Sequence, residues 1–342
     1  MSACFAPFRS LPPPGILLRD GRTGNGGRMA RFLFRRLAGM LAVALVMSFV
    51  VYSLIGLMPG DPIDLMVQSI PNLTPEDARR LKAIYGLDRP LIERYLAWLG
   101  AALSGDLGYS RLYAQPVLEI LGPRLLNSLL LIGTSLALGF AVALPLGIYA
   151  ASRPGRAGDV AVNLVAFAGI SMPVFWLAIL LIILFAATWR LLPASGMGEA
   201  ELGDRLRHLA LPVLTLAIAS AGGLLRYVRA GMREAIGQDF IRTARAKGVG
   251  PLRLLLGHAL RHAMIPVVTI LALDLGALFS GALVTETMFA YLGMGKTIYD
   301  AVMGNDFNLA LAALMLATVM VLVANLLADL VYAGLDPRIR LA

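Results

Sequence analysis

Asp274 is a carboxylate in an otherwise uncharged apolar stretch, 263–285. A carboxylate at such a position in a membrane is costly, roughly 2.5–3.5 kcal/mol on insertion scales, and therefore favours the interior of a helix bundle or a wet cavity. There it could contact a substrate or carry a proton. It could equally be protonated, or hydrogen-bonded to a neighbouring helix. The apolar stretches contain no second acid, lysine or arginine to pair with it, which weakens the proton-relay interpretation.

Segment 290–297 approaches the phosphate-binding pattern GxxxxGK[ST], but Ala290 stands where the pattern has glycine and no soluble strand precedes it. We expect no nucleotide site there. The three histidines are not spaced to bind a metal, and the patterns HExxH and GxSxG are absent. The sequence therefore predicts no catalytic residue, no metal, no cofactor and no enzymatic activity.

Segment 226–262 combines eight Lys/Arg residues with more apolar residues than a solvated loop would carry. One interpretation is a basic amphipathic helix that lies on lipid headgroups. The other is a docking element for a cytoplasmic partner. The small residues Ala244, Ala246 and Gly248 favour docking, because another protein surface can approach them closely.

The composition places these residues in a membrane protein. Of 342 residues, 58% are hydrophobic and only 15% charged, with a mean hydropathy of +0.76. Soluble domains carry about 25% charged residues. A soluble enzyme, a disordered chain and a nucleic-acid-binding domain are therefore excluded despite the net charge of +9. The single cysteine, Cys4, cannot form an internal disulfide.

Long charge-free stretches predict an all-α, polytopic membrane protein, since crossing the bilayer takes about 20 helical residues. Six transmembrane helices are predicted, at 29–60, 125–152, 160–189, 209–226, 263–285 and 307–329. A count of five spans competes with this prediction, because the stretch 209–226 is short and the stretch 263–285 contains Asp274.

The distribution of basic residues predicts that both termini are cytoplasmic. Segments on the side of the N-terminus hold 19 Lys/Arg and those on the other side hold 11, which follows the positive-inside rule. The cytoplasmic parts are then 1–28, 227–262 and 330–342. The extracytoplasmic parts are 61–124, predicted to form short surface helices, and a re-entry segment, 286–306. Residues 1–28 are predicted to be a disordered tail, or to precede a true start at Met29.

The order and spacing of several short motifs resemble the inner-membrane permease subunit of ABC importers of the dipeptide/oligopeptide type, which has nickel and oligosaccharide relatives. The resemblance runs from about Met29 to the C-terminus. The motifs are Pro59-Gly60-Asp61-Pro62, Tyr85-Gly86-Leu87-Asp88, Gly105-Asp106-Leu107-Gly108, Ser171-Met172-Pro173, Leu192-Pro193-Ala194-Ser195-Gly196, Arg242-Thr243-Ala244-Arg245-Ala246-Lys247-Gly248, Glu286-Thr287-Met288-Phe289, Gly293-Met294-Gly295 and Leu335-Asp336-Pro337-Arg338.

The resemblance implies a type I ABC importer permease fold in the bacterial inner membrane. It implies that residues 242–248 form the EAA-type loop that couples to an ATPase, with Arg242 in place of the glutamate of the general pattern. The implied partners are a second permease subunit, two ATP-binding subunits, an extracytoplasmic solute-binding protein and the lipid bilayer, without nucleic acid. The implied cargo is a di- or oligopeptide, with nickel, glutathione or an oligosaccharide as alternatives.

Two other classes of function stay open at this point. An ion-coupled secondary transporter would use Asp274 as its coupling carboxylate. A membrane scaffold would transport nothing and would need neither Asp274 nor the docking of segment 242–248.

Overall fold

The computed structural model describes residues 25–57, 76, 89–199 and 201–335. Residues 1–24, 58–75, 77–88, 200 and 336–342 lie outside it. The motifs predicted at 59–62 and 85–88 and most of the predicted N-terminal tail therefore fall outside the described residues, as does the end of the predicted C-terminal tail.

The described chain is mostly helical, which confirms the all-α prediction. A two-residue antiparallel pairing, Tyr109 with Pro116 and Ser110 with Gln115, is the one sheet in this part of the chain. In chain order the elements are α1 (Asn25–Gly56), α4 (Leu91–Leu103), β1 (Tyr109–Ser110), β2 (Gln115–Pro116), α5 (Val117–Ser152), α6 (Ala157–Ser171), α7 (Val174–Leu181), η1 (Ile182–Thr188), α8 (Leu202–Gly237), α9 (Asp239–Ala246), α10 (Pro251–Arg253), η2 (Leu254–Ala259), α11 (Leu260–Met288), α12 (Met294–Met303) and α13 (Phe307–Leu335), where η1 and η2 are π-helical.

Five helical stretches in the described residues are long and apolar enough to cross a membrane, and the count reaches six if α6 and the continuous α7–η1 helix form one span. The chain is therefore a multi-pass membrane protein. The stretches that pass alone are Leu33–Gly56, Val117–Ser152, Leu202–Gly237, Pro251–Leu271 and Phe307–Val331.

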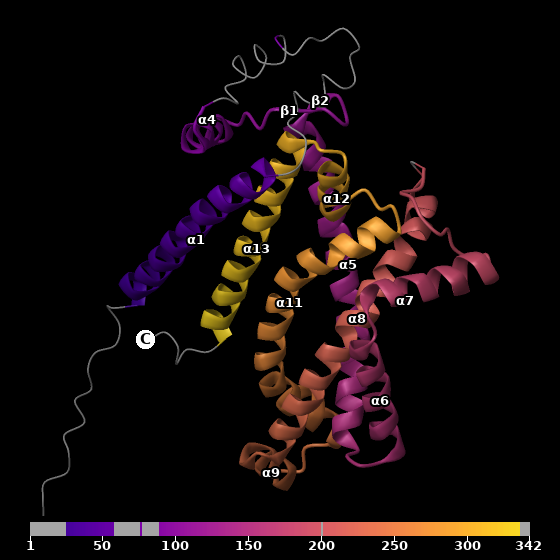
Figure 1. Cartoon of the computed structure of the whole chain (residues 1–342). Coiled ribbons are helices and arrows are strands. Elements are labelled where there is room, and N and C mark those ends of the chain that lie inside the picture. Colours follow the sequence, from indigo (N-terminus) through magenta and orange to yellow (C-terminus); the bar gives the residue numbers. More distant parts are fainter. Residues whose placement is uncertain (1–24, 58–75, 77–88, 200, 336–342) are drawn as a thin grey trace, which may run out of the picture.

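The segment expected as one helix over 160–189 is instead bent by 104° between α6 and α7. Proline at position 173 explains the break. Its ring disfavours a helical conformation of the preceding residue, and Met172 is extended, with φ −84° and ψ 126°. In Figure 1, α7 accordingly runs across the bundle rather than along it.

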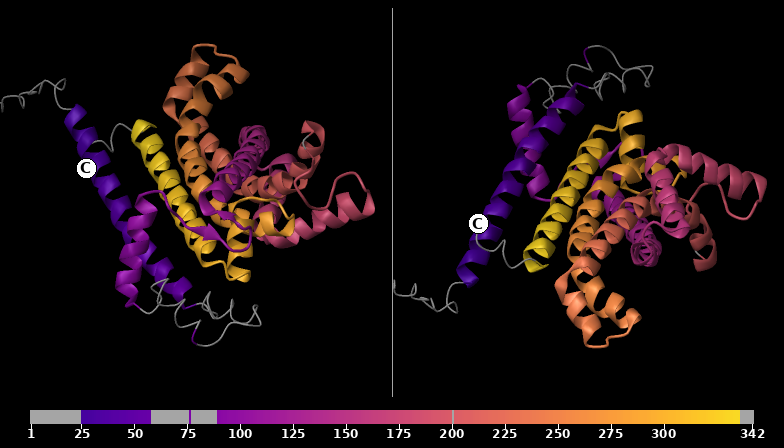
Figure 2. Two further views of the ribbon diagram at one scale, coloured as in Figure 1. Left: turned by 90° about the horizontal axis from the view of Figure 1, so that it is seen from above. Right: turned by 90° about the horizontal axis from the view of Figure 1, so that it is seen from below.

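Helices α5, α8 and α11 form the centre of the molecule, and α6 packs on α8. Helix α13 lies between α11 and α1, so α1 is at the edge of the bundle (Figures 1 and 2). The contact between α5 and α8 is close at glycines. A Cβ added at Gly147 would lie 2.6 Å from Val228 Cγ1, and one at Gly139 would lie 2.8 Å from Ser220 Oγ. Small residues thus allow close helix packing.

Several helices extend beyond the charge-free stretches from which they were predicted. Helix α8 includes the expected span 209–226 but runs from Leu202 to Gly237. Helix α5 begins at Val117, eight residues before the predicted start, and includes Pro123 and Arg124. The extension of α8 positions the site, because α9 starts two residues after α8 ends.

Candidate functional site

The basic segment singled out in the sequence forms α9 and the turn that follows it. Helix α9 lies at the end of the bundle opposite α4, β1 and β2 (Figure 1). It contacts η2 and the end of α8. Asp239 stands in its first turn and Arg245 in its last, which complements the helix dipole at both ends.

One face of α9 is anchored and the other is exposed. Ile241 is 1% exposed and Ala244 is 9% exposed, and both belong to a buried apolar cluster with Met232, Ala259 and Val267 from α8, η2 and α11. Phe240 stacks on His262 at 4.4 Å between ring centroids. The exposed residues of the predicted coupling segment are Arg242, Thr243, Arg245, Ala246, Lys247 and Gly248.

Ala244 therefore differs from the expectation that all three small residues offer a surface to a partner. Its small side chain lets α9 pack against its own protein. Ala246 and Gly248 are exposed. Gly248 has φ +79° and nothing within 4 Å of an added Cβ. Gly248 lies just after the end of α9, and its backbone is left-handed. Glycine is favoured at such positions because it adopts this conformation without strain.

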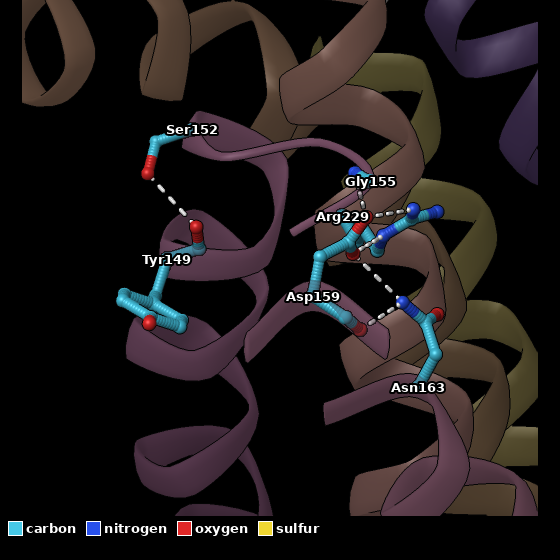
Figure 3. Close-up of polar contacts among 6 residues, drawn as sticks. All are labelled: Tyr149, Ser152, Gly155, Asp159, Asn163 and Arg229. Atoms are coloured by element: carbon cyan, nitrogen blue, oxygen red, sulfur yellow. Dashed lines mark hydrogen bonds and ion pairs between the residues drawn. The ribbon is translucent and has the colours of Figure 1, made fainter. Parts of the chain in front are cut away.

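An ion pair between Asp159 and Arg229 ties the first turn of α6 to α8 (Figure 3), at the end of the bundle where α9 lies (Figure 1). Asp159 is 3% exposed. Its carboxylate accepts hydrogen bonds from Arg229 Nε at 2.6 Å and Arg229 Nη2 at 2.8 Å. The Gly155 amide and Asn163 Nδ2 also donate to it, at 2.9 and 2.8 Å. The bidentate geometry with further donors satisfies a carboxylate that is nearly out of contact with water, while the Arg229 side chain keeps some exposure.

This cluster is absent from the sequence-based predictions. Asp159 and Arg229 are 70 residues apart in the chain, so no local pattern joins them. Arg229 lies eight residues before the end of α8, from which α9 follows after one residue. The pair consequently links the start of α6 to the part of α8 that precedes α9.

Asp274 lies near the middle of α11 and is half-buried. Its carboxylate makes no hydrogen bond or ion pair with any residue whose placement is described. The structure brings neither Arg242 nor any other residue of segment 242–248 near it, since α9 is at the end of the bundle. The two predicted sites are thus separate features.

A second buried carboxylate, Glu286, joins α11, α5 and α12 at the other end of the bundle. It is fully buried. It accepts a hydrogen bond from Ser128 Oγ and one from the Lys296 amide at 3.1 Å. Ser128 Oγ in turn accepts a hydrogen bond from the Met294 amide at 2.7 Å. Glu286 therefore caps α12, a role that its motif alone does not reveal.

The same junction engages both the amide and the side chain of Lys296, in the segment 290–297 that approaches the phosphate-binding pattern. The Lys296 amide donates a hydrogen bond to the Glu286 carboxylate, and Lys296 Nζ forms an ion pair with Asp300 at 2.5 Å. Ala290, in the turn that follows α11, has φ +48°. Nearby, burial and the charge of Glu286 raise the pKa of Tyr291 to about 12, so its hydroxyl keeps its proton and donates to the Asn127 carbonyl at 3.3 Å.

The β1–β2 hairpin is held to the start of α13 by a third carboxylate. Asp306 is 2% exposed and accepts hydrogen bonds from Ser110 Oγ at 2.5 Å and the Leu112 amide at 2.9 Å. Gly108, with φ +80°, lies against Asn308, whose Nδ2 donates to the Tyr109 carbonyl at 3.1 Å. The motif 105–108 with Ser110 is therefore a structural anchor. Within the described ranges, no three His, Cys, Asp or Glu side chains are grouped to hold a metal ion.

A polytopic helical bundle with a short, anchored, basic helix exposed at one end is the architecture of a membrane permease subunit. The chain belongs to the family of binding-protein-dependent transport system inner membrane components. That family's model matches residues 143–341, and the model of its N-terminal part matches residues 29–121. This places the protein in the inner membrane as a multi-pass ABC importer permease.

Curated relatives cover nearly the whole chain. A putative peptide permease protein of Brucella ovis is 37% identical over 91% of this chain and 99% of its own length. The oligopeptide transport system permease protein AppB of Bacillus subtilis is 35% identical, and the dipeptide transport system permease protein DppB of Escherichia coli is 34% identical, each with the same shares covered.

The fold is similar to that of a chain of the MetNI methionine ABC transporter, solved in an inward facing conformation. The TM-score is 0.54 at 19% identity, and the match covers 64% of this chain and 97% of the other. This likeness supports the fold, and with the family it confirms the prediction of an ABC importer permease.

Proposed function

We propose that this chain is the permease subunit of a peptide importer and that α9 with the turn after it, residues 242–248, docks on a separate ATPase. The observation that carries the docking proposal is the two-sided build of α9. Ile241 and Ala244 fix it to the bundle, while its basic face is left exposed. A short element of this kind can transmit a push or pull because it is rigidly connected to the helices behind it.

The orientation belongs to the same proposal. The excess of Lys/Arg on the side of segment 226–262 supports a cytoplasmic α9 and cytoplasmic termini. The hairpin anchored by Asp306 is then extracytoplasmic, where a loaded solute-binding protein would be received. We assign ATP hydrolysis to the partner subunits, because this sequence carries no complete GxxxxGK[ST] pattern.

The peptide cargo is supported by the printed names of the relatives, which are peptide, dipeptide and oligopeptide permeases. Nickel, glutathione and oligosaccharide are alternative cargoes. We further propose that a second permease subunit, different from this one, completes the pathway, together with two ATP-binding subunits.

Reconstitution tests this function. The chain in vesicles with a second permease, two ATPase subunits and the binding protein is expected to accumulate a labelled dipeptide when ATP is present on the α9 side. The chain alone is expected to accumulate none. Accumulation by the isolated chain, driven by a proton or sodium gradient, would overturn the proposal, and selective accumulation of Ni²⁺ would change its cargo.

A substitution of Asp274 distinguishes an ATP-driven permease from an ion-coupled secondary transporter. Asp274→Asn keeps the shape of the side chain and removes its charge. An ATP-driven permease is expected to retain uptake within about threefold, since no charge partner of Asp274 is lost, whereas an ion-coupled carrier would lose accumulation altogether. The measurement is the initial rate of dipeptide uptake and its dependence on ATP and on the pH gradient.

A further inference from the structure

A hollow of about 520 Å³ lies between the end of η1 and the start of α8, outside the features discussed above. One part of its lining is apolar, with Ile182, Ala186 and Leu191. The other part carries two arginines, Arg190 and Arg207, beside Asp204. An apolar wall next to two guanidinium groups suits a ligand that is itself part apolar and part anionic.

Both arginines are available to a ligand. Neither guanidinium makes a hydrogen bond or an ion pair with another residue in the described part of the chain. The neighbouring Arg205 differs, because its Nε donates to the Glu199 carbonyl at 3.2 Å. Asp204 is already engaged, since it accepts the Glu199 amide at 2.6 Å and its Oδ1 lies 3.5 Å from His208 Nδ1. The hollow therefore has a net positive charge.

The backbone holds Arg190 at this place. The η1 helix ends at Thr188, and the chain folds back after Trp189, so that the Leu191 and Leu192 amides both donate to the Phe185 carbonyl, at 2.9 and 3.3 Å. Arg190, which lies between Trp189 and Leu191, has φ +52°. A left-handed conformation is uncommon for a long side chain and is kept only where its surroundings enforce it.

The outer surface next to the hollow has the character of a lipid interface. Trp189, which directly follows η1, is 53% exposed, and Ile183 on η1 is 52% exposed. Trp176, near the start of α7, is 45% exposed. An exposed tryptophan at the end of an apolar helix, followed by an arginine, is typical of the level of lipid headgroups. The apolar wall of the hollow continues into this surface through Ile182.

We propose that this hollow binds the headgroup of an anionic phospholipid, with Arg190 and Arg207 on the phosphate and an acyl chain along η1. Arginine pairs suit phosphate oxygens because the guanidinium donates in a planar fork. Charge complementarity and continuity with the exposed apolar face of η1 select a lipid. A free phosphate would gain nothing from the apolar wall. This inference is independent of the proposed cargo and of the docking of α9.

Quenching of Trp189 fluorescence tests the site. The chain has three tryptophans, so Trp98→Phe and Trp176→Phe leave Trp189 as the only reporter beside the hollow. The full-length protein is reconstituted in phosphatidylcholine vesicles that contain an equal mole fraction of brominated phosphatidylglycerol or brominated phosphatidylcholine. We expect selective quenching by the anionic lipid, with a relative affinity that changes roughly fivefold for each arginine removed.

Matched variants separate the site from the general attraction of a basic protein to anionic lipid. R190Q and R207Q are each expected to weaken the selectivity, and the double variant to abolish it. R205Q removes the same charge from the same region and is expected to keep it. Equal quenching by the two lipids in the unmodified background, selectivity that persists in the double variant, or full competition by inorganic phosphate would each overturn the assignment.

Discussion

Gly248→Asp is expected to abolish ATP-driven dipeptide uptake while the bundle stays folded. Gly248 is exposed, with no atom within 4 Å of an added Cβ, so the variant creates no clash within the chain. If the surface is covered by the ATPase, the new carboxylate becomes a buried, unpaired charge. Such a charge costs about 3 kcal/mol or more, which weakens docking roughly a hundredfold or more. The measurement is uptake together with co-purification of the ATPase subunit.

Gly248→Asn is the matched control. The backbone at this position is left-handed, with φ +79°, a conformation that Asn and Asp adopt more readily than other non-glycine residues. The two variants therefore impose similar backbone strain and similar volume, and differ in charge. We expect Gly248→Asn to retain much of the uptake and of the bound ATPase. Full uptake in Gly248→Asp would contradict the docking proposal and would favour a scaffold without coupling.

The apolar spans could be predicted from sequence because one physical requirement, the absence of charge over a bilayer thickness, acts on local sequence alone. The charge-free windows that led to α1 and α13 are of this kind. The same requirement says nothing about where a helix continues into water. Helix α8 carries Asp204 before its apolar part and Arg233 after it, so its length was underestimated. A search for helical periodicity across those charges would have found the extension.

The bend between α6 and α7 had a readable signal in Pro173, because proline disfavours a helical conformation of the residue before it. The orientation of Ala244 was also readable, since Ile241 and Ala244 are three residues apart and lie on one face of a helix. The Asp159–Arg229 pair and the Glu286 cap were not readable. Each joins residues from distant segments, and a single sequence contains no information on which of its acids and bases meet.

Breaking the Asp159–Arg229 pair is expected to have the second large effect. Asp159→Asn leaves Arg229, whose side chain is 22% exposed, without its charge partner. It also weakens the hydrogen bond from the Gly155 amide. Since α9 follows α8 after one residue, we expect a movement of α9 to reach α6 through α8 and this pair. We expect the initial rate of uptake to fall at least about tenfold, because removing one member of a buried ion pair is strongly destabilising.

A purely structural role would lower the amount of folded protein, whereas a role in transmission would also change the ATP hydrolysed per peptide transported. The decisive measurement is therefore that ratio in reconstituted vesicles, alongside the thermal unfolding midpoint.

The double variant Asp159→Asn/Arg229→Gln removes both charges and is expected to recover part of the loss of uptake, since the effects of the two substitutions are coupled. Asp329→Asn is the control, because it breaks an Asp–Arg pair with Arg36 between α1 and α13 that is more exposed and is therefore expected to matter little. An Asp159→Asn protein that transports with an unchanged rate and an unchanged ratio would show that α9 moves without this connection to α6.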